Sequence, residues 1–168
     1  MSFSLRSGRQ RGLSASAARD EAPPAVARGS PGEGALDDRQ RTPRKHVFAV
    51  NSSPDFLLIV REVLTDEGYA VTTSDFEPNV FTRIVMRNPD ALIIDVAPGE
   101  SAGWDLLRRL HLETKTSEIP ALVTSTSPRL LEQVHDEAAW YGMNRSFLTK
   151  PLDLDELVRT IREMVGDA

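Results

Sequence analysis

PDALIID, residues 89–95, is the stretch of sequence that decides the fold. Its centre, Ala91–Asp95, carries the strongest short apolar run in the chain and ends on an aspartate. A continuous apolar run of this length is too short for an ordinary helix and is typical of a strand buried on both faces, as in a parallel sheet. We therefore predict a central strand that ends at Asp95.

Other short apolar runs, separated by amphipathic stretches, surround this strand in the sequence. Four further strands are predicted at His46–Val50, Tyr69–Thr73, Ala121–Ser125 and Ser146–Thr149. Helical spacing of apolar residues predicts helices at about Pro54–Glu67, Asn79–Arg87, Gly103–Leu112, Pro128–Tyr141 and Leu154–Val165. The alternation is that of βα units, so the predicted fold is (βα)5, a doubly wound five-stranded parallel sheet with helices on both faces.

Local signals support the first and last helices. Ser53 is a candidate N-cap, Pro54 stands at the first helical position, and Gly68 follows as a terminator. Asp153 is the candidate cap of the last helix.

The chain of 168 residues is long enough for one domain and a tail. Residues 1–45 are rich in Ser, Ala, Gly, Pro and Arg and have no sustained apolar period, so we predict a disordered basic tail followed by a domain at 46–168. A basic arm that docks on an acidic partner or nucleic acid, and an organellar transit peptide, are alternatives for the tail.

Charge and composition narrow the function. Residues 1–45 hold nine Arg/Lys and five Asp/Glu, whereas 46–168 hold eleven and twenty, so the predicted domain is acidic and no direct nucleic-acid binding is expected of it. The chain lacks cysteine and any apolar stretch of about 20 residues, which fits a cytoplasmic protein without a membrane span.

Polar residues stand where the predicted strands end, and a parallel sheet brings those ends together at one edge. They are Asn51 and Ser52 after the first strand, Asp95 at the end of the third, Ser125 and Thr126 at the fourth, and Lys150 with Pro151 after the fifth.

An aspartate at the end of a buried strand, with a lysine and a hydroxyl from neighbouring strands, suits a carboxylate that accepts a phosphoryl group. The lysine and the hydroxyl would bind the phosphoryl oxygens. Taken alone, Asp95 is better explained as a cap of the loop that follows it. The lysine and the hydroxyl at the neighbouring strand ends favour the phosphoacceptor.

Three segments resemble the receiver domains of two-component response regulators, which have a flavodoxin-like, CheY-type fold. They are PDALIIDVAPGESAGWDLL at 89–107, IPALVTSTS at 119–127 and FLTKPLDLDEL at 147–157. The most specific features are Pro89-Asp90 before the apolar strand, Gly103 eight residues after Asp95, and Lys150-Pro151 with Phe147 three residues before the lysine. The resemblance covers about residues 46–168.

The resemblance implies a role for each matching residue. Asp95 would be the phosphoacceptor, Lys150 the phosphate-binding lysine, Ser125 the switch hydroxyl and Phe147 the aromatic switch residue. The backbone carbonyl of Ala97 would bind Mg²⁺ beside Asp95, and the Lys150–Pro151 peptide would be cis.

The chain departs from the family after the first strand, where two acidic Mg²⁺ ligands are usual and Asn51 and Ser52 stand instead. Mg²⁺ prefers charged oxygen ligands, so the predicted metal site at Asp95, Ala97, Asn51 and Ser52 is weak or absent.

The resemblance thus implies a single-domain phosphorelay receiver, phosphorylated on Asp95 by a sensor histidine kinase or a phosphotransfer protein. Its downstream protein target would bind the face of the fourth helix, fifth strand and fifth helix, and a homodimer is compatible with this arrangement. The alternative is a pseudo-receiver, an interaction module that works without phosphorylation.

An enzyme is not expected. A hydrolase with an aspartate nucleophile on a related sheet would normally carry a second acid two residues later, where this chain has Ala97, and no general acid or base is visible beside Asp95.

Overall fold

The computed structural model describes residues 43–140 and 144–168. Within these residues, five strands alternate with five helices along the chain. The strands are β1 (His46–Val50), β2 (Ala70–Ser74), β3 (Ala91–Asp95), β4 (Ala121–Ser125) and β5 (Arg145–Thr149). The helices are α1 (Pro54–Asp66), α2 (Val80–Arg87), α3 (Ala102–Leu112), α4 (Pro128–Trp140) and α5 (Leu154–Val165).

All the strands are parallel and form one sheet in the order β2-β1-β3-β4-β5. The order runs outward in both directions from β1 and β3, which is the doubly wound arrangement predicted from the sequence. β3 is central, as its apolar run indicated, and each of its five residues is buried. The fold class is therefore confirmed.

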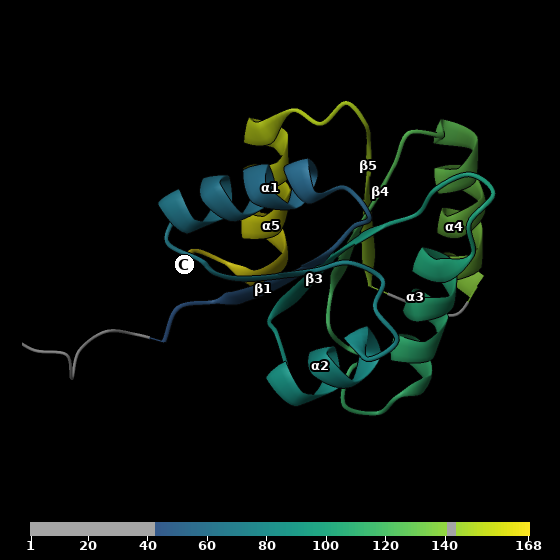
Figure 1. The fold of residues 1–168 in the computed structure, drawn as a ribbon, viewed down its shortest axis with the longest axis horizontal. Coiled ribbons are helices and arrows are strands. Elements are labelled where there is room, and N and C mark those ends of the chain that lie inside the picture. Colours follow the sequence, from purple (N-terminus) through teal and green to yellow (C-terminus); the bar gives the residue numbers. More distant parts are fainter. Residues whose placement is uncertain (1–42, 141–143) are drawn as a thin grey trace, which may run out of the picture. The chain divides into compact units, whose positions relative to one another are not determined.

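Helices cover both faces of the sheet, and each face has its own apolar core. In Figure 1, α1 and α5 lie on one side of the strands and α2, α3 and α4 on the other. Alternate strand residues supply the two cores: Phe48 and Ile94 pack under α2, α3 and α4, whereas Ala49 and Ile93 pack under α1 and α5. This alternation decides on which side of the sheet each residue of the site lies.

The predicted capping signals are present. The Ser53 side chain accepts a hydrogen bond from the Phe56 amide at the start of α1, and Asp153 accepts from the amides of Asp155 and Glu156 at the start of α5. Gly68 follows α1 with φ +95°. Such caps satisfy amides that a helix leaves unpaired, and a positive φ is ordinary for glycine.

Predicted and observed boundaries agree within one residue, and β2 shows why they differ. The prediction began this strand at Tyr69, but the Tyr69 amide donates to the Leu64 carbonyl at the end of α1, and the first residue in register with β1 is Ala70. Tyr69 is fully buried and its hydroxyl donates to the Gly166 carbonyl. It therefore joins α1 to the sheet instead of pairing in it.

At the other edge, β5 begins at Arg145, which pairs with Ala121, one residue before the predicted start. Tyr141, the predicted end of the fourth helix, lies outside the described residues, as does the predicted tail as far as residue 42. The boundary at residue 45 stays a prediction. No helix within the described ranges is long and apolar enough to span a membrane.

Candidate functional site

The carboxyl ends of four strands meet around Asp95. Its neighbour in the β4 register is Thr124, and the residues before Asn51 and Asp95, Val50 and Ile94, are partners in the β1–β3 register. Lys150 follows β5, and its amide donates to the Ser125 carbonyl at 2.8 Å. The sheet therefore gathers residues that are 99 positions apart in the sequence, from 51 to 150, at one edge.

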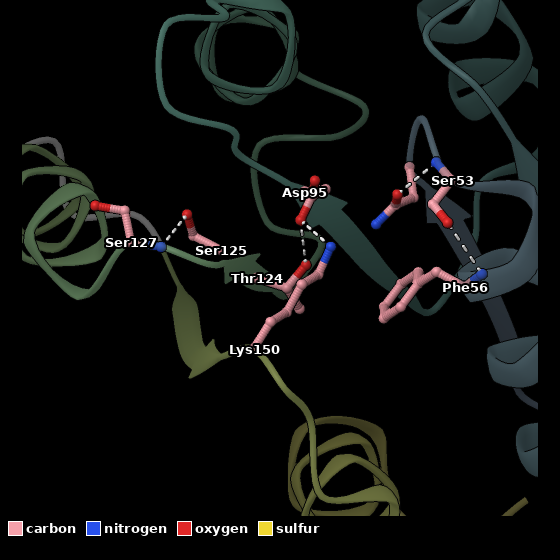
Figure 2. A network of polar contacts seen from close by, with 8 residues as sticks. Ser53, Phe56, Asp95, Thr124, Ser125, Ser127 and Lys150 are labelled. Atoms are coloured by element: carbon pink, nitrogen blue, oxygen red, sulfur yellow. Dashed lines mark hydrogen bonds and ion pairs between the residues drawn. The ribbon is translucent and has the colours of Figure 1, made fainter.

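Asp95 is 7% exposed, and both of its side-chain contacts fall on one oxygen. The Lys150 Nζ lies 2.6 Å from Asp95 Oδ1, and the Thr124 hydroxyl donates to the same oxygen at 3.0 Å (Figure 2). No described residue forms a hydrogen bond or ion pair with Oδ2. One carboxylate oxygen is thus held by two donors, and the other is available for a bond to a ligand.

The ammonium group of Lys150 lies over an aromatic ring. Its Nζ lies 4.4 Å from the centroid of the Phe56 ring, and the Lys150–Pro151 peptide is cis, as the resemblance implied. The face of an aromatic ring attracts a cation, most strongly where water is excluded. Phe56 therefore helps to hold the ammonium group beside Asp95, a role that the sequence analysis did not predict.

Thr124 is the hydroxyl that contacts Asp95, and the sequence analysis missed it. The signal was available, because Thr124 is in register with Asp95 and lies on the same face of the sheet, whereas the adjacent Ser125 faces the opposite side. Ser125 is fully buried, and its Oγ accepts a hydrogen bond from the Ser127 amide at 3.1 Å, just before α4 (Figure 2).

Phe147 lies on the same side of the sheet as Ser125. It packs against the core under α2, α3 and α4, and its ring meets the His135 ring of α4 edge-on, at a centroid distance of 5.2 Å. The structure thus separates the predicted residues into two groups: Lys150 with Asp95 on the α1–α5 side, and Ser125 with Phe147 on the α4 side.

Asn51 is 1% exposed, and the two ends of its amide are in different situations. Its Oδ1 accepts a hydrogen bond from the Ser53 amide at 2.8 Å, whereas its Nδ2 is buried without a hydrogen-bond partner among the described residues. Turning the amide over would place Nδ2 against the Ser53 N–H, donor against donor. The orientation is thus fixed, and Asn51 presents an N–H₂ group instead of an oxygen. Ser52 is exposed.

These residues do not fit the Mg²⁺ site that the resemblance implied. Asn51 presents hydrogen-bond donors where the site would need an oxygen. The Ala97 carbonyl accepts from the Glu100 amide at 3.2 Å and keeps a second lone pair, so it alone does not exclude the ion. Asp55 is exposed in the first turn of α1, and no cluster of three or more His, Cys, Asp or Glu exists within 43–140 and 144–168. Mg²⁺ sites in proteins usually use one or two carboxylates with several waters or phosphate oxygens, so the single carboxylate of Asp95 is the lower limit. The misfit comes from the N–H₂ group that Asn51 presents in place of a second oxygen ligand.

Two relatives match most of the described domain. The uncharacterized 14.6 kDa protein in the sodA1 3' region of Leptolyngbya boryana is 30% identical over 117 residues, which cover 70% of this chain and 87% of that protein. The two-component response regulator ORR3 of Oryza sativa subsp. indica is 28% identical over 126 residues, or 73% of this chain and 92% of the regulator.

Solved structures share the fold. The chemotaxis protein CheY4 of Vibrio cholerae superposes with a TM-score of 0.62 at 23% identity, over 73% of this chain and 99% of CheY4. The receiver domain of the sensor histidine kinase PA1611 from Pseudomonas aeruginosa gives 0.57 at 19% identity, over 74% of this chain and 100% of that domain, and is described with a magnesium ion coordinated in its active-site cleft.

The family follows from the sequence. The family model of the response regulator receiver domain matches residues 47–162. This range contains β2 to β5, all of β1 except His46, and the site residues from Asn51 to Lys150. The chain therefore belongs to the response-regulator receiver family, the CheY-like domains of two-component signalling.

Proposed function

We propose that this chain is a phosphorylatable receiver of a phosphorelay, in which Asp95 accepts a phosphoryl group from a sensor histidine kinase or a phosphotransfer protein. One observation carries the proposal: Asp95 Oδ1 is held by Lys150 at 2.6 Å and by Thr124 at 3.0 Å, whereas Oδ2 has no partner in the described part of the chain. A carboxylate held in this way presents one oxygen in a fixed orientation to an incoming phosphorus atom.

In the proposed step, Asp95 Oδ2 forms a bond to the phosphorus of a phosphohistidine. The P–N bond breaks, the imidazole nitrogen keeps its electron pair, and the ring takes up a proton. The product is an acyl phosphate on Asp95 and a neutral histidine on the partner. The Lys150 ammonium, already beside the carboxylate, would then stabilise the negative charge on the phosphoryl oxygens.

The fourth helix, fifth strand and fifth helix would carry the signal to a downstream protein. A continuous path supports this part of the proposal: the Lys150 amide donates to the Ser125 carbonyl, the Ser125 hydroxyl accepts from the Ser127 amide, and the Ser127 hydroxyl accepts from Leu130 in the first turn of α4. Movement of Lys150 toward a phosphoryl group would pull on Ser125 and hence on the start of α4.

Receiver domains generally bind Mg²⁺ at this edge of the sheet, and the donor set around Asp95 does not fit that ion. The test must therefore be made both with and without the metal. Purified protein is incubated with phosphoramidate, with Mg²⁺ and with EDTA, and its intact mass is measured beside that of Asp95→Asn.

A mass gain of one phosphoryl group in the native chain, absent in Asp95→Asn and reversed by mild base, is the expected result. No gain under either metal condition, and none from a panel of histidine kinases, would contradict the proposal. The chain would then act as a pseudo-receiver that binds its partners without phosphorylation.

A further inference from the structure

The strongest unexplained feature of the site is the Asn51 side chain. It is 1% exposed, its Oδ1 is used by the Ser53 amide, and its Nδ2 has no hydrogen-bond partner within 43–140 and 144–168. A buried donor without an acceptor is costly and uncommon in native proteins. It points to a ligand that brings an acceptor oxygen to this position.

Asn51 lies next to the acceptor. Val50 and Ile94 are register partners in adjacent parallel strands, and Asn51 and Asp95 are the residues that follow them. Adjacent strands are about 4.8 Å apart, so the two backbones are close enough for both side chains to contact one small ligand. Ala49 and Ile93 pack under α1 and α5, and strand alternation places Asn51 and Asp95 on this same side.

The chemistry of the amide selects the charge of that ligand. An N–H₂ group directs two hydrogen atoms outward and repels a cation, whereas it donates readily to an oxyanion. The Lys150 ammonium, 2.6 Å from Asp95 Oδ1, provides a second donor group and a positive charge. Both groups suit the oxygens of a phosphoryl group bound to Asp95.

The local charge supports the same conclusion. Two carboxylates at the positions of Asn51 and Ser52 would repel an incoming phosphoryl group, and a divalent cation bound to them would offset that repulsion. Here the two positions hold an amide and a hydroxyl, and Lys150 balances the charge of Asp95. With Asn51 and Ser52 in place of two acidic residues, the site lacks two metal ligands. It also lacks the negative charge that the metal would neutralise.

We infer that the acceptor site of this chain binds the phosphoryl group without a divalent cation, with Asn51 Nδ2 and Lys150 Nζ as donors to its oxygens. The inference rests on the proposed function, because it concerns the phosphoryl group that Asp95 would accept. Its consequence is a receiver whose phosphorylation does not depend on Mg²⁺.

The first experiment measures binding, independently of phosphoryl transfer. Beryllofluoride, a phosphoryl mimic that binds aspartate carboxylates, is titrated into ¹⁵N-labelled full-length protein in buffer freed of Mg²⁺, and the side-chain amide resonances are followed by NMR. The Asn51 resonance is assigned by its loss in Asn51→Ala. The expected result is a shift of this resonance and of the Asp95 backbone amide, with an affinity that added Mg²⁺ does not change.

Two variants at one position sharpen the result. Asn51→Ala removes the donors without adding a charge and should weaken beryllofluoride binding about tenfold, followed at the Asp95 amide. Asn51→Asp has nearly the same shape but replaces the donors by a carboxylate, and its binding should require Mg²⁺. Thermal unfolding of both variants is measured beside the native chain to check that they are folded. Two results would overturn the inference. One is that the native protein binds the mimic only with Mg²⁺ or not at all. The other is that Asn51→Ala binds it as tightly as the native chain does.

Phosphorylation with phosphoramidate then separates this inference from the proposed function. Modification of Asp95 at the same rate in EDTA and in Mg²⁺ supports both. Modification that strictly requires Mg²⁺ leaves the proposed function standing and overturns the inference. A chain that binds beryllofluoride without metal but is never phosphorylated supports the inference about the site and overturns the function.

Discussion

Gly103, in the first turn of α3, lies directly against the backbone of Asp95. A Cβ atom placed on Gly103 would be 2.0 Å from the Asp95 carbonyl oxygen and 3.0 Å from its carbonyl carbon. Both of these atoms belong to the backbone of a buried strand, so neither can move aside cheaply. The glycine eight residues after the acceptor is thus required by the close approach of α3 to the end of β3.

Gly103→Ala should therefore destabilise the domain and disturb its acceptor. Overpacking of a buried contact costs about 1–3 kcal/mol, and relief of this one requires α3 or the end of β3 to shift. We expect a lower midpoint in urea denaturation and slower modification of Asp95 by phosphoramidate.

Gly99→Ala is the matched control for Gly103→Ala. Gly99 lies in the loop that leads into α3, with φ +80° and nothing within 4 Å of the position that a Cβ atom would take. Alanine there introduces only backbone strain of about 1–2 kcal/mol. It should leave the modification rate near that of the native chain. Equal modification rates in the two variants would show that the contact does not shape the acceptor.

The two neighbouring hydroxyls of β4 should have separable roles. Thr124→Val keeps the shape of the side chain and removes the hydrogen bond to Asp95 Oδ1, which for a charged acceptor is worth about 1.5–3 kcal/mol. We expect lower stability and slower modification of Asp95. Ser125→Ala removes the acceptor for the Ser127 amide and leaves the Asp95 contacts in place.

Hydrogen exchange distinguishes these two variants. Ser125→Ala should be modified on Asp95 but should fail to transmit the change in exchange that phosphorylation produces at the start of α4. If Ser125→Ala slows modification more than Thr124→Val does, the assignment of roles from the register of β3 and β4 is wrong.

Phe56 should stabilise the position of Lys150 through the face of its ring. Phe56→Leu keeps an apolar side chain but removes the cation–π contact at 4.4 Å, whose loss should cost about 0.5–2 kcal/mol of stability. Phe56→Tyr retains an aromatic face and serves as the control. Modification should slow in the leucine variant and not in the tyrosine variant; slowing in both would mean that packing, and not the ring face, matters.

The sequence predicted the parts of this molecule that depend on periodicity. The apolar run at 91–95 and the caps at Ser53 and Asp153 depend only on nearby residues, and the structure confirms them. Contacts between strands were harder to predict, because they depend on the register of the sheet. Thr124 and Ser125 are adjacent but face opposite sides, and only the register shows that Thr124 is the neighbour of Asp95.

The state of Asn51 could not be predicted from the sequence. The loss of an acidic residue was visible, and it predicted a weak metal site. The direction of the amide depends on the Ser53 N–H, which binds Oδ1 only because of how the chain turns into α1. The same turn brings Phe56 to Lys150, a contact across 94 positions of sequence that no local pattern encodes.

His46 should make the stability of the domain depend on pH. It stands at the start of β1, where its Nε2 pairs with the Thr72 hydroxyl at 2.9 Å. Burial and, to a lesser extent, the positive charge of Arg87 lower the pKa of His46 below its ordinary value of 6.5, and Asp90 partly opposes this. The folded state therefore favours the neutral ring.

Because the unfolded chain binds this proton more readily, the contribution of His46 is fully present above about pH 6.5 and is lost as the pH falls toward its lowered pKa in the folded state. Urea denaturation of the native chain and of His46→Gln, measured from about pH 7.5 to about pH 5.5, isolates this effect. Glutamine can still bond to Thr72 but does not titrate. The stability of the native chain should fall more steeply on acidification than that of the variant, and parallel curves would show that His46 is not the group responsible.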